Sequence, residues 1–92
     1  MKEMLNKKRT ITKPWGHEII WGETKNYLGK ILFIKEGSRL SLQYHEHKEE
    51  TILVLSGRLE LVASRATTQG GMETLILEEG DTFHVRPYVI HR

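Results

Sequence analysis

Polar and apolar residues alternate along several short stretches of this chain. Between residues 39 and 45, polar side chains occupy every second position and apolar ones lie between them: Arg39, Ser41, Gln43 and His45 against Leu40, Leu42 and Tyr44. Side chains two apart in an extended strand point the same way, so this alternation predicts a strand with one polar and one apolar face. Other short runs predict strands at 17–21, 27–35, 50–55, 58–64, 73–77 and 82–85.

Turn-forming residues separate these predicted strands. Gly57 and Glu79-Gly80-Asp81 predict tight turns, and residues 66–71 predict a hairpin loop. No stretch shows sustained helical periodicity. Short strands at even spacing, joined by polar turns, predict an all-β sandwich or barrel.

The start of the chain is polar. Lys13-Pro14-Trp15-Gly16 predicts a turn, because proline fixes its own φ and restricts the residue before it. A length of 92 residues is that of one domain. We therefore expect an N-terminal arm at residues 1–12 and a single domain at residues 13–92.

The alternation at residues 39–45 leaves open which face points inward. If the leucines point inward, the polar face meets water. If the polar face points inward, it offers the nitrogen and carboxylate ligands that divalent metals bind. In that case Glu50 points inward with Ile52 and Val54, and an apolar set points outward: Leu40, Leu42, Tyr44, Leu53 and Leu55. So large an exposed patch predicts that a second copy covers it in a homodimer.

Composition and charge exclude several classes of function. The net charge of +2 gives no case for nucleic acid, and the basic residues near the start predict a solvated arm. The chain has no cysteine, which excludes disulfides and thiolate chemistry. No apolar run approaches the ~18 residues of a membrane span, and nothing near Met1 resembles a signal peptide. We therefore expect a cytoplasmic protein with no membrane partner.

Two stretches of sequence carry a specific spacing. Gly37 is followed by five residues and then Gln43-x-His45; Glu50 comes after four more, and Gly57 after a further six. Downstream, Gly80 leads to His91 eleven positions on. These spacings resemble the two motifs of the cupin family. Gln43 stands where the first motif has a histidine, and the spacing favours His45 over His47 as the second one.

The second motif departs from the cupin pattern in three places. Its proline is one place late, at Pro87, and Tyr88 replaces the inner glycine. The motif also expects an asparagine four residues after the histidine, but the sequence ends at Arg92. We therefore expect a barrel that is truncated at the C-terminus or completed by a partner.

Further residues make the resemblance specific to one group of cupins. The run Leu-Ser-Leu-Gln-x-His-x-His, the opening Lys-Pro-Trp-Gly and the closing His91-Arg92 resemble the cupin domain of type II mannose-6-phosphate isomerases over about residues 13–92. This resemblance implies an all-β, cupin-type double-stranded β-helix (jelly-roll) barrel. It also implies one divalent ion bound by Gln43, His45, Glu50 and His91. Zinc is the first expectation, with manganese, nickel, cobalt or iron as alternatives.

The resemblance implies a metal-dependent aldose–ketose isomerase acting on a sugar phosphate. His47, Lys30 and Arg92 are the candidate catalytic residues, for acid–base work or charge stabilisation. Arg39 is the candidate for substrate binding, because its planar fork suits a phosphate or hydroxyls. Three alternatives stay open: a metal cupin that binds a sugar without isomerising it, an iron-dependent cupin oxygenase, and a metal-free structural remnant. Gln43 in place of histidine argues against the oxygenase.

Overall fold

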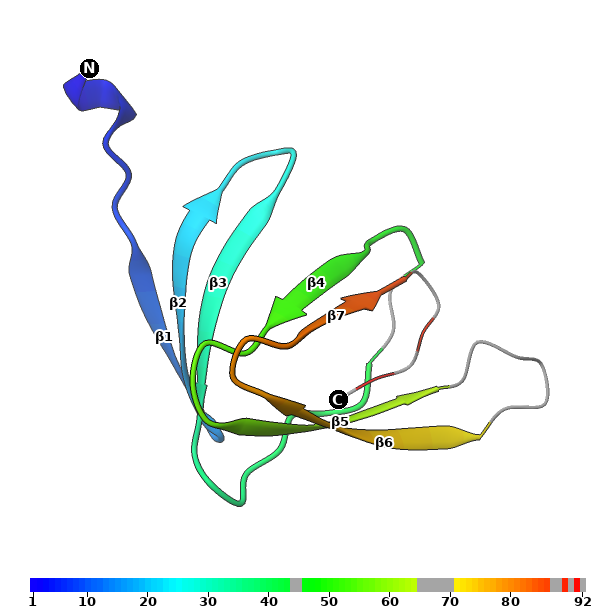
Figure 1. The fold of residues 1–92 in the computed structure, drawn as a ribbon. Helices are drawn as coiled ribbons and strands as arrows, with labels where there is room; N and C mark the ends of the chain where they lie inside the picture. The colour runs from blue at the N-terminus through cyan, green and yellow to red at the C-terminus, as the bar shows by residue number, and fades with distance from the viewer. Residues whose placement is uncertain (44–45, 65–70, 87–88, 90, 92) are drawn as a thin grey trace. The chain divides into compact units, whose positions relative to one another are not determined.

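The structure is a computed structural model that describes residues 1–43, 46–64, 71–86, 89 and 91. The chain divides into two compact units, Met1–Leu40 and Ser41–Arg92. All of the strand pairs found in the described residues are antiparallel, and a single 3₁₀ turn, η1 (Lys2–Met4), precedes them. Figure 1 shows the seven strands. The predicted all-β class is therefore confirmed. No helix within the described ranges is long and apolar enough to cross a membrane.

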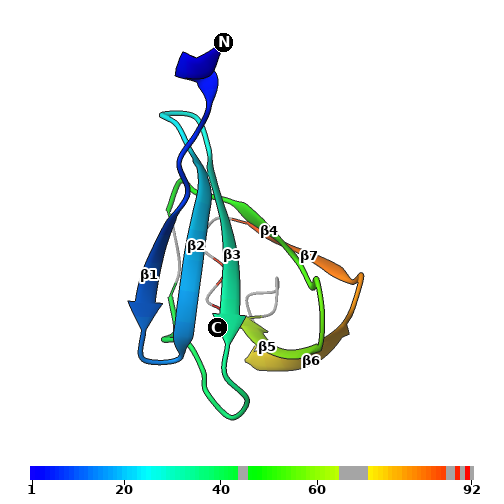
Figure 2. The same ribbon diagram turned by 90° about the vertical axis from the view of Figure 1, so that its left-hand side faces the viewer.

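The first unit is a three-stranded sheet. Its strands are β1 (Arg9–Lys13), β2 (Gly16–Glu23) and β3 (Leu28–Ile34), in the order β1-β2-β3 (Figure 2). Every second residue of the central strand β2 is buried, from Gly16 to Gly22. In η1, a hydrogen bond from the N-terminal ammonium lowers the pKa of the exposed Glu3 carboxyl.

Two features of this sheet depend on single residues. Sequence analysis placed residues 9–12 in an arm, but Arg9 pairs with Ile20 and Lys13 with Gly16. This strand was missed because Ile11 is its one apolar residue. Gly16 begins β2 with a φ of 151°, and a Cβ there would collide with the carbonyl oxygen of Phe33. Glycine is thus required where β2 meets β3.

The second unit contains two strand pairs. β4 (Glu50–Leu53) pairs with β7 (Thr82–Val85), and β5 (Arg58–Ser64) pairs with β6 (Met72–Glu78). A hydrophobic cluster joins them, in which buried Val54, Leu61 and Leu77 are packed by four partly buried residues: Ile52, Leu59, Leu75 and Phe83. The turn before β7 closes by backbone bonds from Val54 N to Asp81 O, 3.0 Å, and from Gly80 N to Val54 O, 2.8 Å.

The facing predicted for residues 50–55 is confirmed. Glu50 and Ile52 are half-buried and Val54 is buried, whereas the residues between them are exposed. The strand predicted at residues 39–45 is wrong for the described residues 39–42, which form no strand. Among the described residues 39–43, Gln43 is the one that pairs, through an isolated bridge to His91. Alternation predicts facing, but a strand also needs a continuous partner, which these described residues lack.

Candidate metal centre

Three of the four predicted metal ligands belong to one part of the second unit. His91 pairs with Gln43 through two backbone hydrogen bonds, of 3.0 and 2.9 Å, and also forms a bridge with Ala63. Glu50 is the first residue of β4, and its Oε1 lies 2.7 Å from His91 Nε2. The fourth predicted ligand, His45, lies outside the described residues. Residues separated by up to 48 positions in sequence, 43 to 91, thus meet at His91, Gln43 through its backbone and Glu50 through its carboxylate.

The imidazole of His91 has a defined orientation. The residue is 4% exposed, and its Nδ1 lies 3.0 Å from the carbonyl oxygen of Val89. A carbonyl oxygen only accepts hydrogen bonds, so Nδ1 carries the proton and donates it. Nε2 is then the nitrogen that faces Glu50. Metal-binding histidines typically donate their other ring N–H to a carbonyl or carboxylate, which fixes the tautomer.

The contact between His91 Nε2 and Glu50 Oε1 brings two predicted metal ligands to within 2.7 Å of each other. Because Nδ1 donates to Val89, Nε2 is the ring nitrogen that carries the lone pair, and the Glu50 carboxylate faces it. The residues present thus fit a divalent metal, for which imidazole and carboxylate are ordinary ligands.

The described residues supply part of this ligand set. Within the described ranges, no group of three His, Cys, Asp or Glu residues could hold a metal ion. Glu50 and His91 make a pair, and Gln43 would add an amide oxygen. The four-ligand centre therefore stays a prediction that depends on His45.

The described catalytic and substrate-binding candidates belong to different units. His47 is exposed in the second unit, between Gln43 and β4. Arg39 is exposed in the first unit, and Lys30 lies on β3 of the same unit. Arg92 lies outside the described residues. Of the catalytic and substrate-binding candidates, His47 is the one described in the same unit as the Glu50–His91 pair.

Sequence analysis missed a buried carboxylate in the first unit. Glu18 is 6% exposed, and Lys30 Nζ lies 3.5 Å from its Oε2, while Lys13 Nζ lies 4.0 Å from Oε1. A signal was present in the sequence: Glu18 shares its position in the alternation with Gly16 and Ile20, which both point inward. An acid on a buried row needs cationic partners, and the two lysines provide them.

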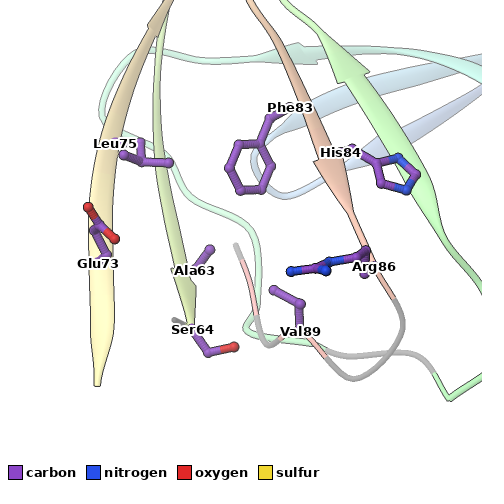
Figure 3. A pocket seen from close by; sticks show the side chains of 8 residues that line it. All are labelled: Ala63, Ser64, Glu73, Leu75, Phe83, His84, Arg86 and Val89. Carbon is purple, nitrogen blue, oxygen red and sulfur yellow. The ribbon is translucent and has the colours of Figure 1, made fainter. Parts of the chain in front are cut away.

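A pocket of about 190 Å³ was also missed. It lies in the second unit, between the β5–β6 pair and β7 (Figure 3). Two of its lining residues, Ala63 and Val89, also contact His91 through their backbones. The pocket brings together the ends of several strands, and no sequence spacing indicates such a set.

Comparison with known proteins assigns the family. The model of the family described as Mannose-6-phosphate isomerase C-terminal matches residues 1–92. The chain therefore belongs to this family, and the expected cupin-type fold is confirmed.

Curated relatives include a mannose-1-phosphate guanylyltransferase and a xanthan biosynthesis protein. The chain is 31% identical over 81 residues to the mannose-1-phosphate guanylyltransferase RfbM of Salmonella typhimurium, covering 88% of this chain and 15% of the relative. It is 31% identical over 84 residues to the xanthan biosynthesis protein XanB of Xanthomonas campestris, covering 91% of this chain and 16% of the relative. The chain thus spans about one sixth of the length of these relatives. No solved structure gives a significant match.

Proposed function

We propose that this chain is a metal-dependent isomerase domain that interconverts an aldose phosphate and its ketose, with mannose 6-phosphate as the first substrate. The observation that carries this proposal is the buried His91, oriented by Val89 and facing Glu50 at 2.7 Å. Membership of a family described by mannose-6-phosphate isomerase supports it. RfbM, which is named for its action on a mannose phosphate, supports the substrate class.

We assign each candidate residue a separate role in this reaction. Gln43, His45, Glu50 and His91 would hold the divalent ion, which when bound polarises a carbonyl and orients neighbouring oxygens. His47 is exposed and lies between His45 and Glu50 in sequence, so its imidazole is our candidate to take the proton from C2 of the aldose and return it to C1, while the proton of the C2 hydroxyl passes to the C1 oxygen. Arg92 would stabilise the negative charge that develops on the substrate oxygens. Lys30 and Arg39 stay predictions for acid–base work and phosphate binding.

Exchange with solvent deuterium tests the isomerase proposal. Metal-loaded protein is incubated with mannose 6-phosphate in D₂O, and C2 is followed by NMR. We expect deuterium at C2 and the appearance of fructose 6-phosphate, and a His47→Gln variant should lose on the order of 10²–10³ in rate. If no hexose or pentose phosphate in a panel gives either exchange or ketose, the isomerase proposal fails.

A second candidate function is a metal cupin that binds a sugar phosphate without isomerising it. The names of the two relatives favour it, because they describe a guanylyltransferase and a xanthan biosynthesis protein and neither name describes an isomerase. Binding of mannose 6-phosphate without exchange or ketose would select this candidate. Redox-active iron together with oxygen uptake would instead select the oxygenase.

A further inference from the structure

The pocket of the second unit shares a wall with the candidate metal centre. The carbonyl of Val89, which lines the pocket, accepts the hydrogen bond from His91 Nδ1. Ala63, on the β5 side, is bridged to His91. A molecule in this pocket therefore lies against the residues that position the His91 imidazole.

The pocket has an apolar floor. Leu75 of β6 and Phe83 of β7 project into it from opposite sides (Figure 3). Both pack against the core cluster, which holds them in place. A floor of this kind suits the C–H faces of a ring, and apolar walls with a few polar groups are typical of small-molecule sites.

Three polar groups stand around this floor. The guanidinium of Arg86 extends from the end of β7 toward β5, where Ser64 lies, and Glu73 stands on β6 on the far side (Figure 3). His84 also lines the pocket, but its ring is directed toward β4. There its Nε2 lies 2.8 Å from Glu49 Oε2 and its Nδ1 lies 3.0 Å from Thr51 Oγ1. Besides His84, the polar groups among the described lining residues are thus Arg86, Glu73 and Ser64, and Ser64 and Glu73 each also make another interaction.

We propose that this pocket binds the hydroxyl-bearing ring of the sugar and excludes its phosphate, with Arg86 and Glu73 as the specificity-determining residues. This inference rests on the proposed function for the class of ligand. Among the described lining residues, Arg86 supplies a cation and Glu73 an anion, so a phosphate dianion drawn to Arg86 would also meet the carboxylate of Glu73. A sugar hydroxyl both donates and accepts hydrogen bonds, so it suits both groups.

The geometry of the two charged groups suits neighbouring hydroxyls. Arg86 offers several N–H donors in a planar fork, which can reach two adjacent oxygens. Glu73 offers carboxylate oxygens that only accept, so it takes hydroxyl protons. Glu73 also makes another interaction, which a carboxylate with about four lone-pair sites can accommodate. Together the two residues favour a sugar whose hydroxyls point to both walls.

NMR titration of the isotope-labelled chain of residues 1–92 tests this inference. Methyl α-mannoside should shift the amide signals of Ala63, Leu75 and Arg86, whereas inorganic phosphate should leave them unchanged. The Arg86→Met variant should bind the mannoside about tenfold more weakly, because hydrogen bonds to a charged group are lost. Glu73→Gln, a second variant with the same shape as the wild type, should also weaken binding.

Arg58→Met is the matched control. Arg58 is an exposed arginine on β5 whose Nη2 lies 3.2 Å from Glu78 Oε1, and it does not line the pocket. This variant should bind the mannoside like the wild type. Shifts caused by phosphate, no shifts with the mannoside, or unchanged affinity in both Arg86→Met and Glu73→Gln would overturn the inference.

This titration is independent of turnover. If the mannoside binds as expected but no sugar phosphate is isomerised, the isomerase proposal fails and the sugar pocket stands. If mannose 6-phosphate is isomerised with the same KM by wild type, Arg86→Met and Glu73→Gln, the pocket inference fails and the isomerase proposal stands.

Discussion

The carbonyl of Val89 determines how His91 presents its ring. Because this carbonyl takes the Nδ1 proton, Nε2 is left to face Glu50 from a buried position. Any buried histidine needs hydrogen-bond partners for its ring nitrogens, and here the partner of Nε2 is Glu50, another predicted ligand. This arrangement favours a ligand role for His91, with Glu50 as a second ligand of the same metal.

The cationic partners of Glu18 determine how its buried carboxylate affects the stability of the fold. Its side chain is 8% exposed, and Lys30, at 34%, is the nearer of its two cationic partners. Replacing Lys30 by methionine leaves the carboxylate with Lys13 at 4.0 Å. We expect Lys30→Met to lower the free energy of unfolding by about 1–2 kcal/mol, since a partly buried ion pair loses one member.

Urea denaturation measures this effect. Lys25→Met, at an exposed position in the turn between β2 and β3, is the control and should stay within about 0.5 kcal/mol of the wild type. A Lys30→Met midpoint equal to or above that of the wild type would show that the pair contributes nothing to stability.

At the scale of elements, strands with alternating apolar residues were predictable and others were not. β5 and β7 have the predicted bounds, because apolar side chains alternate along them and glycines stand close by. β1 has one apolar residue and owes its strand structure to pairing with β2. Residues 39–42 alternate clearly but lack a ladder.

Part of the candidate site was also predictable, because some of its residues follow a motif spacing. Gln43, Glu50 and His91 follow from the motif spacing, which reflects a fixed pattern of strand pairing. Glu73 and Arg86 line one pocket between strands, and Glu18 acquires its role from the lysines around it. Such neighbours are set by packing in three dimensions, which one-dimensional spacing does not encode.

The contact between β2 and β3 predicts the effect of one substitution. Gly16 has a φ of 151°, and a Cβ there would collide with the backbone of Phe33. Gly16→Ala should therefore destabilise the fold by about 2–4 kcal/mol, since neither strand can move away without losing its pairing.

Gly71 offers the matched control for this substitution. It precedes β6, has no atom within 4 Å of a Cβ built on it and no positive φ. Gly71→Ala should leave the free energy of unfolding in urea nearly unchanged. Equal stability of the Gly16→Ala and Gly71→Ala variants would refute the proposed clash.

At the scale of the whole molecule, exposed leucines predict association. Leu42, Leu53 and Leu55 of the second unit are 49%, 52% and 58% exposed. The predicted homodimer covers this face, so Leu42→Arg should yield monomer or aggregate in sedimentation velocity. Ile76→Arg, at an exposed position of β6 outside the predicted face, should leave the dimer intact. A wild-type protein that sediments as a monomer at micromolar concentration would contradict this prediction.

Metal content decides whether Gln43, His45, Glu50 and His91 form a metal centre. Wild-type protein purified without chelator is compared by elemental analysis with the His45→Ala/His91→Ala double variant. His84→Ala is the control, since His84 bonds to Glu49 and Thr51 and lies outside the predicted ligand set. We expect one divalent ion per chain in the wild type and in His84→Ala, and none in the double variant. A wild type without metal, or a double variant that retains a stoichiometric ion, would contradict the claim that Gln43, His45, Glu50 and His91 form the metal centre.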